Sequence, residues 1–279
     1  MSELAPQWVD KRESGLEVRR KGKRLRGAGA GRNFDLVFTD RVIVTLVYLR
    51  TGLSQEALAD MYGCSPSSIS RAISEVRPLL AKRGFATKNN GPKLHTMADA
   101  FAYARATSTK LRIDGTEVPV RRPRANKKGR RRFVSGKKRQ NTIKFTVISD
   151  EDGNVLWAGG VVPGRMHDQT AAGHAGINDL LEQFPSVVVS GGNAYRGLFH
   201  DHPGQVVVPP LKPDKEATEE AKEEYEKVRH AQSSERIPVE HSIGKVKWWK
   251  PLQRWTGVRE NLQDTFLAAA SLASEGAAA

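Results

Sequence analysis

Two acidic residues, Asp114 and Glu240, stand where a fold can present a carboxylate to a ligand. Asp114 ends a strand-like run at 110–114, and Glu240 falls in the first turn of a helix expected to begin at Pro238. Carboxylate oxygens suit Mg²⁺ or Mn²⁺, and two such ions about 4 Å apart can hold the attacking and leaving oxygens of a phosphate. Each residue alone also has a simpler interpretation, since Asp before Gly is typical of a turn and Glu near a helix start favours the helix dipole. Their chemistry therefore depends on what surrounds them.

The balance of charge indicates a polyanionic partner. The chain of 279 residues has 45 Lys and Arg against 31 Asp and Glu, a net charge of +14. Such a surplus is typical of nucleic-acid binding, with a solvated basic surface or acidic lipid as the alternatives. Residues 121–144 carry twelve basic side chains and no acidic one between two strand-like runs, so we expect a loop that follows DNA phosphates. The residues of this loop assigned to nucleic acid are Arg121, Arg122, Lys127, Lys128, Arg130, Arg131, Arg132, Lys137, Lys138 and Arg139.

Residues 34–83 have the pattern of a helix-turn-helix. Ser54 is a natural N-cap for one short helix, and Gly63 a natural stop. Ser65 can cap the next helix, whose first residue is Pro66, where a missing N–H costs nothing. An ordinary helical hairpin is the alternative for this segment taken alone. The small polar residues near the start of the second helix, which fit a helix that enters a DNA major groove, are Ser67, Ser68, Ser70 and Arg71.

Beyond residue 97 the chain alternates strand and helix signals. Strands are expected at 110–114, 141–149, 155–162, 186–190 and 205–208, and helices at 168–182, 216–230 and 238–249. Three strands in hairpin order, followed by helix, strand, strand and helix, resemble the RNase H-like fold. The expected fold class is therefore α/β: an RNase H-like mixed sheet with flanking helices, preceded by a small all-α helix-turn-helix domain. That fold gathers carboxylates at the ends of its central strands and on a late helix.

Several ordered motifs of this region resemble one family. They are Ile113-Asp114-Gly115-Thr116, Gly164-Arg165-Met166-His167-Asp168, Ala194-Tyr195-Arg196-Gly197 and Pro238-Val239-Glu240-His241. Together they resemble the DDE transposases of the bacterial insertion-sequence and eukaryotic Harbinger type, and the helix-turn-helix at 53–77 is similar to the domain that precedes the catalytic core in those proteins. The resemblance covers roughly residues 35–272. It implies a DNA transposase that binds element ends and carries out metal-dependent phosphodiester cleavage and strand transfer.

The resemblance implies a role for both carboxylates and reveals one departure. Asp114 matches the first catalytic aspartate and Glu240 the final glutamate, and both would hold Mg²⁺ or Mn²⁺. The second aspartate of the family stands three residues before Tyr195; here that position is Gly192, which has no side chain to ligate a metal. A lost ligand should cost orders of magnitude in rate, so a catalytically inactive, transposase-derived DNA-binding protein is the alternative function. The polar residues beside these motifs that could assist the site are His167, Asp168 (for which a helix cap is the simpler role), Asn193 and His241.

Breaks in composition divide the chain into five expected parts. They are a basic flexible arm at 1–33, a helix-turn-helix DNA-binding domain at 34–83, a linker at 84–96, an RNase H-like DDE catalytic domain at 97–272 and a frayed tail at 273–279. The sequence has no run of about 18 apolar residues and no signal-like N-terminus, and its single cysteine, Cys64, excludes an internal disulfide framework. We expect a cytoplasmic, nucleoid-associated bacterial protein with no membrane contact. Its expected partner is double-stranded DNA, both terminal inverted repeats and target, and a reaction that joins two ends is consistent with a homo-oligomer.

Overall fold

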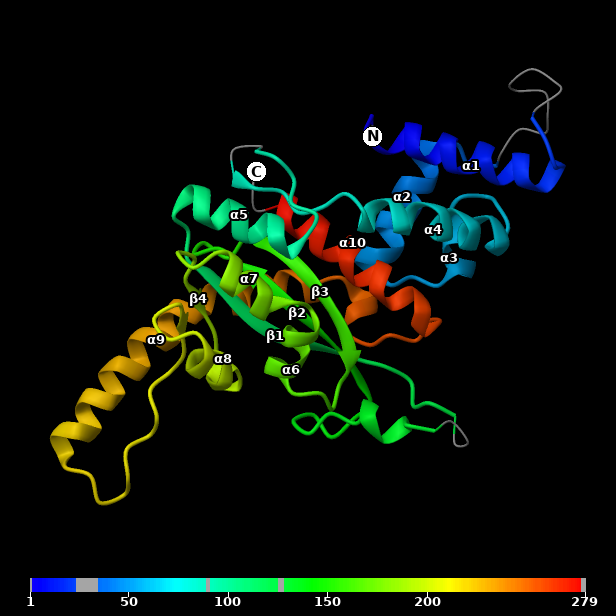
Figure 1. The fold of residues 1–279 in the computed structure, drawn as a ribbon. Helices are drawn as coiled ribbons and strands as arrows, with labels where there is room; N and C mark the ends of the chain where they lie inside the picture. Colours follow the sequence, from blue (N-terminus) through cyan, green and yellow to red (C-terminus); the bar gives the residue numbers. More distant parts are fainter. Residues whose placement is uncertain (1, 24–34, 89–90, 125–127, 277–279) are drawn as a thin grey trace.

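An N-terminal group of helices packs on one end of an α/β body (Figure 1). The computed structural model describes residues 2–23, 35–88, 91–124 and 128–276. The body begins at α5 (Met97–Thr107) and ends with α10 (Leu262–Glu275), which packs against α4 as well as against the sheet. The two parts therefore share a helix in addition to the chain that connects them. The helices of the N-terminal group are α1 (Leu4–Arg20), α2 (Phe38–Thr51), α3 (Gln55–Met61) and α4 (Pro66–Ala81).

Within the described residues, the body is built on a mixed sheet of five strands. They are β1 (Leu111–Pro119), β2 (Thr142–Ser149), β3 (Val155–Pro163), β4 (Val189–Ser190) and β5 (Val206–Val207). Their order in space is β3-β2-β1-β4-β5; β1, β2 and β3 are antiparallel neighbours, whereas β4 and β5 run parallel to β1. This order and these directions are those of the RNase H-like fold, so the predicted fold class is confirmed.

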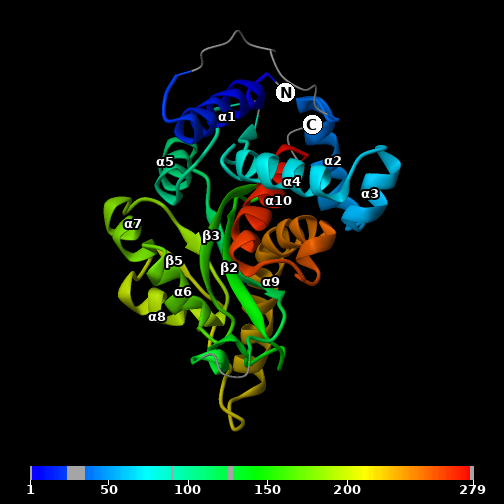
Figure 2. The same cartoon turned by 90° about the vertical axis from the view of Figure 1, so that its right-hand side faces the viewer.

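Helices cover both faces of this sheet (Figure 2). On one face lie α5, α6 (Asp168–His174), α7 (Ile177–Gln183) and α8 (Arg196–Asp201); on the other lie α9 (Glu219–Lys247) and α10. Side chains alternate across a strand, so Ile113 joins the core beneath α5 and α7, while Val118 joins the core beneath α9 and α10. Asp114, the neighbour of Ile113, consequently points towards the face that α9 covers.

The helix-turn-helix forms as its local sequence signals indicate. Ser54 Oγ accepts a hydrogen bond from the N–H of Ala57 at the start of α3, and Ser65 Oγ accepts one from the N–H of Ser68 at the start of α4. Gly63, between the two helices, has a φ of +59°, in the left-handed region where glycine is least strained. These contacts present the first turn of α4 with its serine side chains at the surface.

Residues 4–20 are not the flexible arm that the sequence predicted. They form α1, in which Leu4 is buried and Trp8 Nε1 donates a hydrogen bond of 2.8 Å to Glu75 Oε2 of α4. The Trp8 ring also lies 5.2 Å from the ring of Phe38. Two large apolar side chains one turn apart suffice to dock a helix that is otherwise polar. The rest of the expected arm, residues 24–33, lies outside the described residues.

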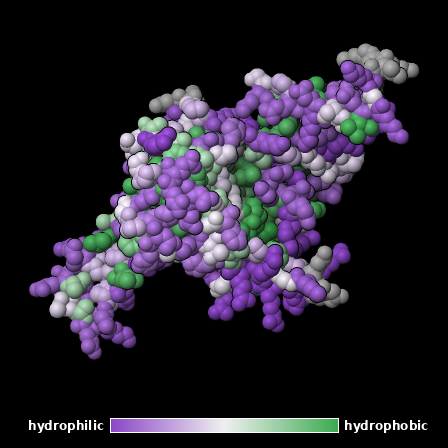
Figure 3. Space-filling view, in the orientation of Figure 1, coloured by the Kyte–Doolittle hydropathy of each residue, from purple (hydrophilic) through white to green (hydrophobic). Residues whose placement is uncertain are grey.

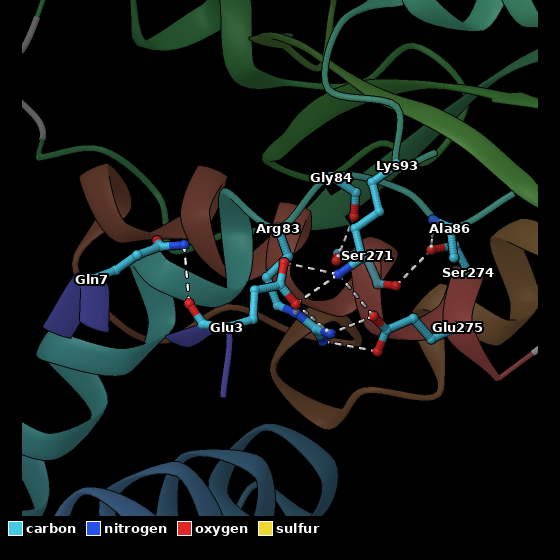
Figure 4. Close-up of polar contacts among 9 residues, drawn as sticks. All are labelled: Glu3, Gln7, Arg83, Gly84, Ala86, Lys93, Ser271, Ser274 and Glu275. Carbon is cyan, nitrogen blue, oxygen red and sulfur yellow. Dashed lines mark hydrogen bonds and ion pairs between the residues drawn. The ribbon is translucent and has the colours of Figure 1, made fainter. Parts of the chain in front are cut away.

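A charged cluster ties the start of α1 to the end of the chain (Figure 4). Glu3 accepts hydrogen bonds from Lys93 Nζ, at 2.9 and 3.0 Å, and lies 3.3 Å from Arg83 Nη2. Arg83 also pairs with Glu275 at the end of α10. The pKa of the Glu3 carboxyl is lowered, chiefly by the hydrogen bond from Lys93 and against the effect of burial. The described residues of the expected linker thus contact the end of α10, through Ala86 with Ser274 and Lys93 with Glu275. α10 itself continues through Ser274 and Glu275, where the sequence predicted a frayed tail.

The two helices expected at 216–230 and 238–249 are one helix, α9, and Pro238 lies inside it. An internal proline removes one backbone hydrogen bond, a cost that the packing of α9 against β1 and β2 offsets. The second half of α9 is also fixed from outside, because Ser242 Oγ donates to the carbonyl of Gly153 in the turn between β2 and β3. The first half projects away from the body (Figure 1). Glu240 therefore lies in the middle of a helix and not in its first turn.

The helix expected at 168–182 and the strand expected at 110–114 both have other bounds in the structure. The helix expected at 168–182 is broken into α6 and α7 at Gly176, whose φ is +90°. The strand expected to end at Asp114 continues to Pro119, which pairs with Thr142 of β2. In the part of the chain that the structure describes, no helix combines the length and the apolar composition needed to cross a membrane.

Candidate active site and nucleic-acid interface

Asp114 and Glu240 both approach the guanidinium of Arg236. Arg236 Nη2 lies 3.5 Å from Asp114 Oδ2 and 3.9 Å from Glu240 Oε1. Asp114 comes from the middle of β1, and Arg236 and Glu240 from successive turns of α9, which crosses that face of the sheet. The structure therefore places two distant carboxylates around one cation that belongs to the chain itself.

Gly192 faces the same guanidinium. It follows β4 and precedes the short 3₁₀ helix at Asn193–Tyr195. A Cβ atom added at Gly192 would lie 3.2 Å from Arg236 Cζ and from Nη2. Arg236 thus occupies the space beside the position at which the family carries its second aspartate. Sequence reasoning missed this residue, although its spacing of four from Glu240 places both on one face of a helix.

Burial dominates the electrostatics of this site. It raises the pKa of the Asp114 carboxyl, against the lowering effects of Arg236 and of the hydrogen bond that Gly115 N–H donates to Oδ1 at 2.8 Å. Asp168 and Glu240 add smaller repulsions that also raise it. Tyr195 is fully buried, and burial raises the pKa of its hydroxyl well above the ordinary value. That hydroxyl has no hydrogen-bond partner among the described residues.

Asp168 lies close to the site, but a lysine holds its carboxylate. Lys144 Nζ lies 2.6 Å from Asp168 Oδ1, donates to the carbonyl of Met166 at 2.6 Å and lies 3.7 Å from Glu117 Oε1. Asp168 is the first residue of α6, in agreement with its simpler predicted role at a helix start. Lys144, the last of the twelve basic residues at 121–144, lies in β2 within the strand expected at 141–149, and it is buried. Its position in an otherwise apolar strand was the signal for a buried ion pair.

The other predicted auxiliary residues form no hydrogen bond or ion pair with Arg236 among the described residues. His167 is exposed and precedes α6, and His241 is exposed on α9. Asn193 is exposed, and its side-chain oxygen accepts a hydrogen bond of 2.8 Å from Arg196 Nη2.

The predicted nucleic-acid residues form two exposed surfaces. On α4, Ser67 and Arg71 are exposed, Ser68 and Ser70 are half-buried, and Ser68 Oγ donates to Asp35 Oδ2 at 3.2 Å. On the loop after β1, exposed basic side chains project beyond the sheet, where Figure 3 shows a strongly hydrophilic surface. This loop borders a cavity of about 590 Å³ between Phe133 and Trp255. Lys127 lies outside the described residues. The other predicted residues of the loop that are exposed are Arg121, Arg122, Lys128, Arg131, Arg132, Lys137, Lys138 and Arg139, and Arg130 is half-buried.

Lys247, at the end of α9, links the site to this loop. Burial lowers the pKa of its amine from 10.5 to about 8; Lys138 adds to this effect, while Glu117 and Asp114 oppose it. We expect one lysine to lose its proton with a midpoint near pH 8 in a ¹³C NMR titration of labelled lysine side chains. The folded chain holds this proton more weakly than the unfolded chain, so the cost of burying the charged amine disappears as the pH rises from 8 towards 10.5.

Replacing the lysine identifies the titrating signal. The resonance with a midpoint near pH 8 should be missing in Lys247→Arg and should titrate at higher pH in Lys138→Ala, which removes a like charge. A set of lysines that all titrate near their ordinary pKa would contradict the burial of Lys247.

Comparison with known proteins decides the family. Residues 113–273, more than half of the chain, match the family model "DDE superfamily endonuclease", and residues 35–86 match "Helix-turn-helix of DDE superfamily endonuclease". The chain belongs to the DDE superfamily endonucleases. The predicted family and the predicted helix-turn-helix are thereby confirmed. The predicted function, that of a DNA transposase, is supported by the same matches and by the transposase relatives.

Curated relatives of this DDE superfamily member come from insertion sequences. The chain is 28% identical to "Putative transposase for insertion sequence element IS112" of Streptomyces albus G, over 89% of this chain and 86% of the relative. It is 25% identical to "Probable transposase for insertion sequence element IS702" of Microchaete diplosiphon, over 83% of this chain and 80% of the relative. These matches extend along both the helix-turn-helix and the body.

Solved structures of the Mos1 transposase are more distant. The pre-cleavage Mos1 transpososome is 13% identical with a TM-score of 0.24, over 97% of this chain and 86% of that chain. The Mos1 paired-end complex with the left transposon end is 11% identical with a TM-score of 0.21, over 92% and 85% of the two chains. The fold assignment accordingly rests on the strand order and on the family match.

The donor set in this DDE protein does not fit a pair of divalent ions. Members of the superfamily depend on divalent metal ions, but among the described residues no three His, Cys, Asp or Glu side chains are gathered as ligands. Asp114 and Glu240 share a guanidinium, and Lys144 holds Asp168. A guanidinium and a divalent cation repel each other, so a metal ion could reach the two carboxylates only if Arg236 moved away.

Proposed function

We propose that this chain binds the ends of an insertion-sequence element as a transposase does, but cuts DNA poorly because its catalytic centre is incomplete. The observation that carries the proposal is the environment of Gly192: the position lacks a carboxylate, and Arg236 lies against it. Transposase relatives and the helix-turn-helix match support the DNA-binding half of the proposal. Double-stranded DNA, as terminal inverted repeats and target, is the partner it requires.

The proposed division of labour follows the fold. Residues 34–83 recognise the element end through the first turn of α4, and the basic loop at 121–139 holds backbone phosphates beside the site on β1 and α9. Residues 84–96 connect this DNA-binding domain to the catalytic-type domain at 97–272. Exposed arginines and lysines on both surfaces supply the positive charge that phosphates require. We place the protein in the bacterial cytoplasm, with the nucleoid DNA, as a homo-oligomer when two ends are joined.

The second candidate function is a transposase that cuts with an altered site. Asp114 and Glu240 are both retained and approach one point, which supports this function. In this second candidate function, Asp114 and Glu240 hold Mg²⁺ or Mn²⁺ after Arg236 has moved. A divalent-dependent nicking assay on the DNA that flanks the coding sequence separates the candidates: nicking by the unchanged chain supports the altered enzyme, and nicking only by Gly192→Asp supports the binder.

DNA binding through the basic loop is tested by salt dependence. We expect the triple variant Lys128→Ala, Arg131→Ala, Arg132→Ala to bind a labelled duplex more weakly, and its plot of log Kd against log salt to be shallower by about 0.9 for each phosphate that the variant no longer neutralises. Fluorescence anisotropy between 50 and 200 mM salt measures both quantities. An unchanged slope would show that these side chains do not meet phosphates, and the proposed interface would be wrong.

A further inference from the structure

A second basic surface lies beside α4, on the helix that the sequence did not predict. Between α1 and the helices α2 and α4 there is a cavity of about 500 Å³. The residues that the family helix-turn-helix matches begin at 35, so α1 lies outside them. The charged residues that border this cavity are Lys11, Arg12, Arg19, Arg41, Arg71 and Glu75.

Three basic residues that border this cavity, Lys11, Arg19 and Arg71, have no acidic partner among the described residues. Glu75 is the acidic residue of the lining, and it already accepts hydrogen bonds from Trp8 Nε1 at 2.8 Å and from Arg41 Nη1 at 3.0 Å. Lys11, Arg19 and Arg71 are exposed, and none of them forms an ion pair within the part of the chain that the structure describes. Three like charges beside one cavity repel one another unless an anion is bound.

The N-terminal end of α1 is docked on the protein, and this holds in place the charged side chains further along the helix. Leu4 is buried against α4, Trp8 packs on Phe38, and Glu3 is tied to Lys93. The contacts that hold the helix do not involve Lys11 or Arg19. A basic helix held in place by separate apolar anchors presents its charges as a surface, whereas a free tail presents them in many directions.

The spacing along α1 suits the backbone of a nucleic acid. Lys11 and Arg19 are eight residues apart and lie on one helix face, about 12 Å from each other at 1.5 Å per residue. Gly15 lies between them, and the space where its side chain would stand is open. Phosphates recur every 3.4 Å of axis along each strand of a duplex, so this distance covers about three of them.

Arg71 joins this surface to the helix that recognises DNA. It is exposed on α4 next to Ser70 and also borders the cavity beneath α1. A duplex whose major groove received the start of α4 would bring one sugar–phosphate strand past α1. We propose that Lys11 and Arg19 of α1, together with Arg71, bind the DNA backbone phosphates that flank the groove read by α4. This site rests on the proposed DNA-binding function.

A pair of charge-matched variants tests the site. The test variant is Lys11→Ala with Arg19→Ala; the control is Lys222→Ala with Lys227→Ala, which removes the same charge from the projecting half of α9. Each full-length protein is titrated with a fluorescein-labelled 30-base-pair duplex between 50 and 200 mM salt. Thermal unfolding of both variants verifies that they are folded, as the separate anchors of α1 lead us to expect.

In the test variant, the slope of log Kd against log salt should be smaller by about two. Raising the salt from 50 to 200 mM should therefore weaken its DNA binding by a factor that is about 16-fold smaller than the factor for the unchanged chain. The control should keep the slope. Hydroxyl-radical footprinting should show a shorter protected tract with the test variant only. An unchanged slope and footprint would overturn the α1 site while leaving the proposed function standing. Absence of DNA binding by the unchanged chain would overturn both.

Discussion

The Gly192→Asp variant should gain divalent-dependent nicking activity of at least about 10²-fold over the unchanged chain. The substitution places a carboxylate just after β4, beside the guanidinium of Arg236 that Asp114 and Glu240 also approach. Three carboxylates offset most of the charge of two divalent ions, whereas two leave the second ion poorly held. Conversion of supercoiled plasmid carrying the flanking DNA to the nicked form, with Mg²⁺ or Mn²⁺, measures the gain.

Space at position 192 permits this substitution if Arg236 yields. The added Cβ would lie 3.2 Å from the guanidinium, a close approach to the far end of a flexible side chain. The Nε of Arg236 is buried and has no hydrogen-bond partner among the described residues, so little holds the guanidinium except the two carboxylates. The new aspartate therefore competes with Asp114 for the arginine before a metal arrives.

Gly192→Asn is the matched control for the carboxylate itself. It adds nearly the same volume against Arg236 but no negative charge, so it should leave nicking at the level of the unchanged chain. Asp114→Asn in the Gly192→Asp background should abolish the gain. Binding of Mn²⁺, followed by electron paramagnetic resonance, should strengthen in Gly192→Asp and not in Gly192→Asn. Equal activity of the Asp and Asn variants would contradict the third-ligand position.

Local signals in the sequence were sufficient where one residue decides the structure. The serines at 54 and 65 cap the helices they were expected to cap, and Gly63 adopts a left-handed conformation between them. The strands expected at 141–149 and 155–162 pair as the hairpin of β2 and β3, and Gly153 in the turn between them has a φ of +78°. The strand order then follows from the rule that consecutive elements pack as neighbours, and from the family resemblance.

Other features depend on contacts that no local pattern contains. α1 is docked by Leu4 and Trp8 against residues thirty or more positions away, so its charged sequence alone indicated a tail. Pro238 suggested a helix start because proline is common in the first turn of a helix. In the structure it lies inside α9, where packing around Ser242 compensates its cost. Arg236 was overlooked because its importance comes from its contact with Gly192, which lies just after β4 and far from α9 in the sequence. The sequence thus indicated that Asp114 and Glu240 share a site, but it did not indicate that Arg236 lies between them and any metal ion.

Removing the Phe266 ring should destabilise the whole chain, and not the body alone. Phe266 is fully buried, and its ring stacks on Phe145 of β2 with a centroid distance of 3.8 Å and an interplanar angle of 6°. Phe266→Ala leaves a cavity in this core and should lower the free energy of unfolding by about 3–5 kcal/mol. Leu211→Ala, at a side chain that is 70% exposed, should change it by less than about 0.5 kcal/mol.

The effect should reach the helix-turn-helix because α10 belongs to two cores. Phe266 packs on the sheet, while Ala268, two residues further on, packs with Leu79 and Leu80 of α4. If α10 loosens, α4 loses its support, so amides of α4 and of β2 should show the same decrease of hydrogen-exchange protection in Phe266→Ala. A decrease in β2 with unchanged protection in α4 would show that the two parts open independently. A shared decrease would mean that DNA held by α4 is positioned relative to Asp114 by one continuous helix, without dependence on a flexible linker.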